Sequence, residues 1–357
     1  DHTLFLKFGV SCFTGLLIYV DDVILFGNSL DTFPAIKTQL HTTFGIKDLG
    51  ILKYFLGLEV AHSSTGITLS QRRYCLDLLQ DSSLLDCKPT TTPLDPTIRL
   101  HQDNGQSFFD VSSYRRLVGR LLYLTSTRPD IAFATQQASQ FMSSPTLSHH
   151  KAFVIILRYL KRAPGLRLFF PQDSFLQLRG FSDANWGGCV DSHRSISGHC
   201  FFIGNSLISW KYKKQLTVAR SSAKAKYRAL ASATCKLQWL QFLLDDLQIT
   251  PHKSHVLFCD NQSALHIAHN LVFHERTKHL EIDCHLVREK VQAGLLRLLP
   301  ISSQDQLADF FTKALLPKTF LYLLSKLGVL DIFHPPTCGG YQRKVSPTLV
   351  QPKLIFT

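Results

Sequence analysis

Two adjacent carboxylates, Asp21 and Asp22, are the first residues of this chain whose types and spacing suggest chemistry. They lie between the apolar runs Leu16–Ile18 and Val23–Phe26, which have the length and β-branched content of strands. The segment therefore predicts a hairpin with Asp21-Asp22 at its turn. Two carboxylates at one tip repel each other unless a divalent cation lies between them, as in two-metal phosphoryl-transfer sites. An ordinary acidic turn is the alternative, because turns favour Asp.

Three further carboxylates stand at strand ends or at the start of a helix in the second half of the chain. Asp183 ends the strand predicted around 176–181, Asp260 follows the strand predicted at 255–259, and Asp309 opens the last predicted helix. Ligands of an open α/β sheet gather at the carboxyl ends of its strands. Three carboxylates gathered there would bind a hard cation such as Mg²⁺. Each aspartate alone could equally be a helix cap or a turn residue, so the hypothesis rests on the three together.

Three lysines follow the apolar strand predicted at 207–210: Lys211, Lys213 and Lys214. They could contact the backbone of a nucleic acid, or they could be a charged hairpin edge that deters aggregation. The sequence leaves both readings open.

Two other patterns predict no site. The histidines between 266 and 285, together with Cys284, have a spacing that fits no zinc motif. Gly187-Gly188 lacks the frame of a phosphate-binding loop, so we do not expect a nucleotide there.

Hydrophobic periodicity predicts the elements that must position these residues. The first half reads as helices and strands in the following places: a helix at 31–44 with Pro34 in its first turn, strands around Gly50 and Gly57, a strand at 66–70, a helix at 71–79, and helices at 114–124, 131–141 and 149–161. The second half reads as strands at 176–181, 199–203 and 207–211, a long helix at 221–247 with a break, a strand at 255–259, a helix from 261, a helix at 282–293, a strand at 295–299 and a helix from 304.

The order of these elements predicts an α/β fold. Three strands followed by alternating helices and strands are typical of a mixed sheet with helices on both faces. A domain boundary is expected near residue 95, because residues 88–96 hold three Thr and three Pro. The tail beyond Asp331 has no acidic residue and is expected to be loosely ordered.

Size, charge and cysteine usage limit the functional class. A chain of 357 residues has room for two or three domains, and 45% hydrophobic with 18% charged residues describes a globular protein. No apolar run is long enough to span a bilayer, and no secretory signal is visible. The nine scattered cysteines indicate free thiols in a reducing compartment. We therefore expect an intracellular protein of the cytoplasm or nucleus.

The net charge of +13 predicts a polyanionic partner, most simply a nucleic acid. A basic surface kept for solubility is the alternative. No membrane partner is expected, because nothing in the chain reads as a membrane-spanning segment.

Taken in order, the chain resembles the C-terminal part of the Ty1/copia-type retrotransposon polyprotein, which carries reverse transcriptase followed by ribonuclease H. The resemblance covers about residues 1–340 and is carried by these segments: Tyr19-Val20-Asp21-Asp22, Ile46–Gly50, Tyr54–Val60, Leu117–Leu124, Thr127–Asp130, Ser182–Ala184, Ser221–Ala223, Cys259–Ala264, His274–His279, Leu307–Asp309 and Phe311–Lys313.

The resemblance implies four regions. Residues 1–95 would be a partial reverse transcriptase palm and residues 96–170 a helical region like a thumb or connection. Residues 171–320 would be a ribonuclease H-like domain with a mixed five-stranded sheet and flanking helices, and residues 321–357 a tail. The implied functions are RNA-directed DNA synthesis and Mg²⁺-dependent cleavage of RNA in RNA–DNA hybrids.

The resemblance also assigns roles to the aspartates. Asp21 and Asp22 match two of three polymerase carboxylates, while the third lies upstream in the family and is not on this chain, which begins at Asp1 rather than Met. Ribonuclease H of this family uses four carboxylates and two Mg²⁺, of which one activates a water and the other stabilises the leaving oxygen. Asp183, Asp260 and Asp309 match three of the four.

Lys226 occupies the position where the family carries the fourth carboxylate, a glutamate. An ammonium has no acceptor and cannot ligate Mg²⁺, so among the aspartates it would act as a tethered cation that competes with the metal. The alternative is a solvated helix residue. Lys236 and Asn185 stand where related sequences carry Glu and Asp. Together with the truncation, these changes suggest a degenerate copy. Part of the positive net charge would then result from mutations that replaced acidic residues.

Three hypotheses follow for this copy. The first is a truncated relic of the reverse transcriptase and ribonuclease H without activity. The second is a residual Mg²⁺-dependent ribonuclease H that uses the three aspartates. The third is a non-catalytic module that binds hybrids or duplexes through its basic surface.

Overall fold

The computed structural model describes residues 3–10, 12–28, 30–102, 105–250, 253–269 and 281–331. The described residues up to Leu69 form one compact unit, and those from Ser70 onward form a second. The segment His274–His279 and the tail beyond Asp331, both discussed above, lie outside the described residues.

The first unit is built from short antiparallel strands and one helix. Strands β1 (Leu4–Phe8), β2 (Phe13–Tyr19) and β3 (Asp22–Gly27) form an antiparallel sheet in that order. Helix α1 (Phe33–Phe44) has a proline in its first turn, as expected. Strands β6 (Gly66–Ser70), β5 (Leu58–Ser63) and β4 (Tyr54–Phe55) are neighbours in a second sheet.

The second unit begins with the helices that the periodicity predicts. They are α2 (Arg72–Asp81), α3 (Val111–Leu124), α4 (Ala132–Ser139) and α5 (Leu147–Arg162). Tyr114, Val118 and Leu121 are fully buried, and their spacing places them on one face of α3. The side chain of Thr146 caps α5 by accepting a hydrogen bond from the backbone of His149.

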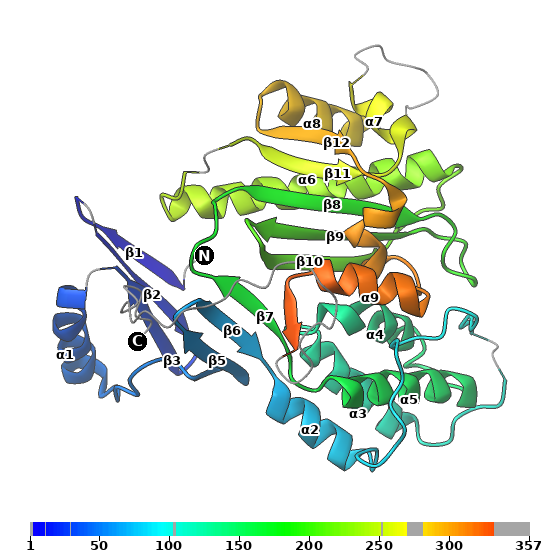
Figure 1. Ribbon diagram of the computed structural model, residues 1–357, viewed down its shortest axis with the longest axis horizontal. Coiled ribbons are helices and arrows are strands. Elements are labelled where there is room, and N and C mark those ends of the chain that lie inside the picture. Colours follow the sequence, from blue (N-terminus) through cyan, green and yellow to red (C-terminus); the bar gives the residue numbers. More distant parts are fainter. Residues whose placement is uncertain are drawn as a thin grey trace. The chain divides into compact units, whose positions relative to one another are not determined.

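A mixed five-stranded sheet forms the centre of the second unit (Figure 1). Its strands are β8 (Leu178–Asn185), β9 (Ile196–Ile203), β10 (Ser206–Lys214), β11 (His255–Cys259) and β12 (Leu296–Pro300). They lie in the order β10-β9-β8-β11-β12, with β8, β9 and β10 antiparallel and β11 parallel to both β8 and β12. The predicted fold class, a mixed five-stranded sheet in an α/β domain, is confirmed.

Helices cover one face of this sheet, and a 3₁₀ segment covers the other. Helices α6 (Ser222–Asp246), α7 (Gln262–His269) and α8 (Glu281–Gln292) share a hydrophobic core with Phe201 of β9. Gly198, three residues earlier on β9, points to the opposite face. A Cβ at Gly198 would lie 2.7 Å from Cβ of Phe311, so this glycine lets the 3₁₀-helix Leu307–Phe311 pack directly on the strand.

Five parts of the fold differ from the predictions. No strand forms around Gly50, because residues 45–53 have neither helix nor strand, and strand β1 was not predicted. Helix α6 runs unbroken for 25 residues, because it contains neither Gly nor Pro. The helix predicted from Gln304 is instead two 3₁₀ turns, Ser303–Asp305 and Leu307–Phe311, followed by α9 (Pro317–Lys326). Strands β7 (Leu166–Pro171) and β13 (Val329–Asp331), which pair antiparallel, were not predicted.

Within the described part of the chain, no helix combines the length and apolar character needed to cross a membrane. The cysteines found there are all free thiols, as the sequence predicts.

His199 makes the stability of the sheet sensitive to acid. This side chain is buried on β9, and burial together with the charges of Lys211 and Lys236 lowers the pKa of its imidazole from 6.5 to about 4. Between these values the unfolded chain binds more protons than the folded one, so the free energy of unfolding falls as the pH falls. We expect His199 to account for a loss of about 3 kcal/mol between pH 6.5 and 4.

Urea unfolding of the wild type and of His199→Leu across this pH range checks the expectation. The variant should lose less stability on acidification than the wild type. Parallel pH profiles for the two proteins would rule out His199 as the titrating group.

Candidate functional site

The fold brings three of the predicted aspartates and two lysines to one edge of the sheet. Asp183 lies near the carboxyl end of β8, and Asp260 directly follows the parallel strand β11. Lys226 lies in the first turns of α6, which packs on β8, and Asp309 lies in the 3₁₀-helix against β8 and β9. We refer to these four residues and Lys313 as the carboxylate site.

Lys226 bridges two of the aspartates. Its ammonium Nζ lies 2.6 Å from Oδ1 of Asp260 and 2.9 Å from Oδ1 of Asp183. The side chain of Lys226 is 16% exposed, whereas those of Asp183 and Asp260 are 0% and 5% exposed. Lys226 is therefore an integral part of the site, and its alternative reading as a solvated helix residue is wrong.

A second lysine, Lys313, completes the site, and the sequence reasoning missed it. Its Nζ lies 2.9 Å from Oδ1 of Asp309 and 3.7 Å from Oδ2 of Asp183. The neighbouring Thr312 donates a 2.6 Å hydrogen bond from its hydroxyl to Oδ2 of Asp183. The sequence did contain a signal for this ion pair: Asp309 and Lys313 are four residues apart, and oppositely charged side chains at that spacing meet in helical turns.

These contacts set the charges of the site. Burial alone would raise the pKa of Asp183, but the ammonium groups of Lys313 and Lys226 outweigh it and hold that pKa below its ordinary value. Burial opposes the charge of Lys226 as well, but Asp183 and Asp260 raise the pKa of its ammonium. Asp309 differs, because burial and the negative charge of Asp183 raise its pKa to about 7 in spite of Lys313. Asp183 and Lys226 are thus held as ions.

The side chains as they stand do not fit Mg²⁺. The ammonium of Lys226 lies within hydrogen-bond distance of both Asp183 and Asp260, at the place between carboxylates where a cation would lie. An ammonium offers only donors and repels a second cation. In the residues that the structure describes, no group of three or more His, Cys, Asp or Glu side chains is arranged to hold a metal ion. Metal binding by Asp183, Asp260 and Asp309 stays a prediction that Lys226 opposes.

Asp21 and Asp22 lie in the other unit, at the tip of the β2–β3 hairpin. The hairpin is confirmed, but its two-residue turn is Val20-Asp21, and Asp22 already pairs with Tyr19 as the first residue of β3. Val20 has a φ of 51°, which is strained for a β-branched residue. Such strain costs about 1–3 kcal/mol and is often found at functional sites. The metal role of the two carboxylates stays a prediction.

The three predicted nucleic-acid contacts lie on β10, an edge strand of the five-stranded sheet. Lys211 and Lys213 are exposed. Lys214 donates a 2.8 Å hydrogen bond to the side chain of Gln140 and is half-buried. Lys211 and Lys213 are therefore available to a partner, whereas Lys214 is engaged inside the unit.

Comparisons with known proteins agree with this architecture. A family model described as reverse transcriptase (RNA-dependent DNA polymerase) matches residues 2–96. The Retrovirus-related Pol polyprotein from transposon RE1 of Arabidopsis thaliana is 41% identical over 337 residues, which cover 94% of this chain and 23% of that protein. The corresponding polyprotein from transposon TNT 1-94 of Nicotiana tabacum is 33% identical over 318 residues, which cover 87% of this chain and 24% of that protein.

Among solved structures, LC11-RNase H1 in complex with an RNA/DNA hybrid is similar at 13% sequence identity and a TM-score of 0.30. The match covers 38% of this chain and 94% of that one.

The class of protein is thus defined by a region that matches the reverse transcriptase family model, followed by an α/β domain with a mixed five-stranded sheet. The chain belongs to the family of copia-type retrotransposon Pol polyproteins, whose C-terminal region it matches. The resemblance drawn from the motifs is confirmed. The chain spans about a quarter of the length of these two polyproteins. Proteins of this family typically use Mg²⁺.

Proposed function

We propose that this chain is a reverse transcriptase and ribonuclease H region whose nuclease site is blocked by its own lysine. It binds RNA–DNA hybrids but cleaves their RNA strand weakly or not at all. The observation that carries the proposal is the position of Lys226, with Nζ 2.6 Å from Asp260 and 2.9 Å from Asp183. In this proposal residues 1–95 are a palm region, 96–170 a helical thumb-like region, 171–320 the nuclease-like domain and 321–357 a tail.

The electrostatics of the site support a block. A tethered ammonium has no translational entropy to lose when it binds, so it competes with a dissolved cation at an advantage. The pKa of Lys226 is raised by its two partners, so the charge is not lost at neutral pH. The single charge of Lys226 offsets one of the two negative charges of Asp183 and Asp260, and the attraction that would draw in a metal ion is correspondingly smaller.

The basic edge of the sheet supports binding without cleavage. Lys211 and Lys213 are exposed on β10. They are two residues apart along the strand, so their side chains lie on the same face of the sheet. Cations on one face suit contacts with successive phosphates, which position a nucleic acid without reading its sequence. In the first unit, Asp21 and Asp22 would be two carboxylates of a polymerase site.

A cleavage assay on a labelled RNA–DNA hybrid tests the block. We expect the wild type to cleave at the background rate in Mg²⁺. Lys226→Glu should raise the rate by about 100-fold or more, since even an outer partner of a metal site is worth about 10–100-fold. Lys224→Glu is the matched control, because it makes the same charge change two residues away on α6, and it should give no gain.

Two further outcomes separate the hypotheses. Wild-type cleavage that Asp260→Asn abolishes would contradict the block and establish a residual nuclease that works with three aspartates. Absence of salt-dependent hybrid binding by the wild type would remove the binding role. Lys211→Ala/Lys213→Ala should weaken that binding and flatten its salt dependence, because each phosphate contact releases counterions.

A further inference from the structure

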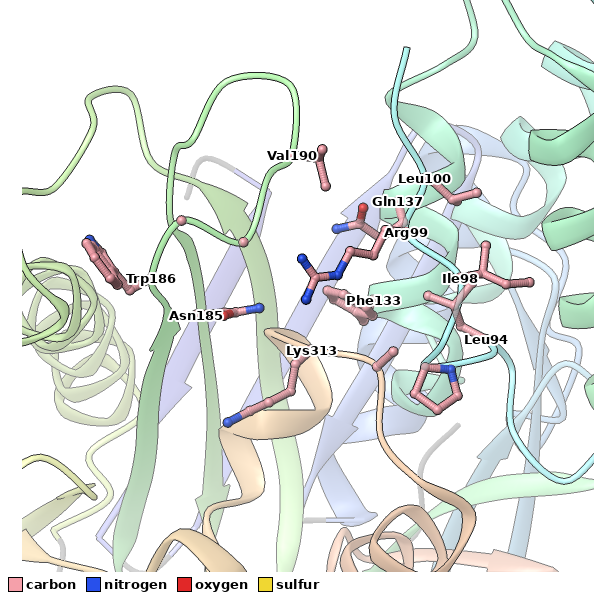
Figure 2. A pocket seen from close by; sticks show the side chains of 14 residues that line it. Leu94, Ile98, Arg99, Leu100, Phe133, Gln137, Asn185, Trp186, Val190 and Lys313 are labelled. Atoms are coloured by element: carbon pink, nitrogen blue, oxygen red, sulfur yellow. The ribbon is translucent and has the colours of Figure 1, made fainter. Parts of the chain in front are cut away.

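A pocket of about 310 Å³ adjoins the carboxylate site within the second unit (Figure 2). Its walls come from four separated segments: residues 94–100, helix α4, the loop that follows β8, and the residues around Lys313. Asn185 lies two residues after Asp183 on β8, and Lys313 pairs with Asp309 of the carboxylate site. A molecule in this pocket would therefore lie next to the carboxylates.

The lining of the pocket is suited to an anion. It includes two cations, Arg99 and Lys313, and no carboxylate. Lys313 is already paired with Asp309, and Figure 2 shows its side chain directed away from Arg99. Arg99 is exposed and forms no ion pair with any described residue. Its guanidinium reaches over Phe133 toward Asn185 (Figure 2) and can bind a phosphate by two parallel hydrogen bonds.

The rest of the lining is suited to a planar ring. The ring of Phe133 and the aliphatic side chains of Leu94 and Ile98 form an apolar wall beside Arg99. The amides of Gln137 and Asn185 border the same space. Each amide nitrogen already donates one hydrogen bond within the unit, to Tyr212 and to the carbonyl of Thr312, and keeps a second N–H for the edge of a heterocycle. An aromatic ring with nearby amides and a guanidinium is a typical recognition surface for an unpaired base and its phosphate.

The segment that carries Arg99 is held at both ends. On one side Lys161 donates a 2.6 Å hydrogen bond to the carbonyl of Cys87. On the other side the backbone N–H of Gln102 donates a 2.9 Å hydrogen bond to Asp191. The pocket is therefore formed before any ligand arrives, and its volume falls at the lower end of the range of small-molecule sites, about 300–1,000 Å³.

We propose that this pocket binds a single nucleotide, with the phosphate on Arg99 and the base against Phe133. The strand of a bound nucleic acid would supply it as an unpaired nucleotide, and in this respect the inference rests on the proposed function. The sequence predicts no nucleotide at Gly187-Gly188, because these glycines do not form a phosphate loop. They contribute one part of the lining of a pocket whose other walls come from distant parts of the chain.

Calorimetric titration with adenosine monophosphate tests the pocket without Mg²⁺ or cleavage. We expect saturable binding by the wild type and binding that is about tenfold weaker in Arg99→Ala, the loss typical of one charge-assisted contact. Arg297→Ala removes another exposed arginine, from β12 at the opposite edge of the sheet from β10, and should bind like the wild type. Thermal unfolding of both variants reports whether they fold.

The other outcomes are decisive as well. No saturable binding, or equal binding by Arg99→Ala and the wild type, would overturn the proposal. Inorganic phosphate that binds as tightly as adenosine monophosphate would reduce the pocket to an anion site and also overturn it. A hybrid with a one-nucleotide overhang should bind more tightly than the blunt hybrid, and only when Arg99 is present. If the wild type binds adenosine monophosphate but does not bind the hybrid, the proposed function is contradicted and the nucleotide pocket is not.

Discussion

Replacing Lys226 with methionine is expected to lower the free energy of unfolding by about 3 kcal/mol. The substitution keeps the length of the side chain but leaves Asp183 and Asp260 buried without their shared counter-charge. Removing one partner of a buried ion pair costs about 3–5 kcal/mol, and the 16% exposure of Lys226 argues for the lower end. Chemical denaturation at neutral pH, without divalent cations, measures the difference.

Lys224→Met is the matched control for this prediction. Lys224 lies on the same helix two residues away and forms no ion pair with the described residues, so its replacement should cost less than about 0.5 kcal/mol. Adding Asp260→Asn to Lys226→Met should recover part of the loss, because one of the two stranded charges is removed. Equal stability of Lys226→Met and the wild type would show that the site does not depend on the lysine.

Lys226→Glu extends the argument to metal. With four carboxylates together, this variant should be less stable than Lys226→Met in the absence of divalent cations, since like charges repel in a buried site. Mg²⁺ should then stabilise Lys226→Glu, by about 2.7 kcal/mol at a concentration 100 times the dissociation constant. The wild type should show no comparable shift. A wild type stabilised as strongly as the variant would contradict the displacement of metal by Lys226.

The sequence was sufficient for the aspartates because their positions follow from local rules. Asp183 and Asp260 end strands, and the parallel pairing of β8 and β11 brings both ends to one edge. The position of Lys226 beside them came from the family resemblance, because Lys226 stands where the family carries a glutamate. Lys313 could not be assigned in the same way. Its contact with Asp183 depends on how the 3₁₀-helix packs at Gly198, and that is a tertiary effect.

The missed parts of the fold have a similar cause. Strand β13 has three residues and pairs with β7 across more than 150 residues of chain, so neither its length nor its neighbours in sequence gave a signal. The turn at Val20 was misplaced by one residue because turn preferences favour the two aspartates, whereas the register of β2 and β3 puts a strained valine there. Periodicity predicts elements well, but it does not fix register or long-range pairing.

The second large effect is expected at Asp130, far in sequence from the carboxylate site. Asp130→Asn should lower the free energy of unfolding by about 3–5 kcal/mol. Oδ1 and Oδ2 of Asp130 accept hydrogen bonds of 2.9 and 2.8 Å from the guanidinium of Arg128, and Tyr159 donates a third of 2.7 Å. Arg128 and Asp130 are only 1% and 2% exposed. An amide cannot balance the charge of Arg128, which would remain buried without a counter-ion.

Asp81→Asn is the matched comparison, because it breaks another aspartate–arginine pair at similar distance. Asp81 lies 2.6 Å from Arg120, but the two side chains are 61% and 23% exposed. Water replaces the lost contact there, so the cost should stay below about 1 kcal/mol. Denaturation of both variants under identical conditions decides the matter. Equal losses would mean that the pair of Arg128 and Asp130 stabilises the helices no more than a surface contact does. The hydrogen bonds of this pair to Tyr159 of α5 and to the carbonyl of Ala163 would then add little to the stability of the helical region.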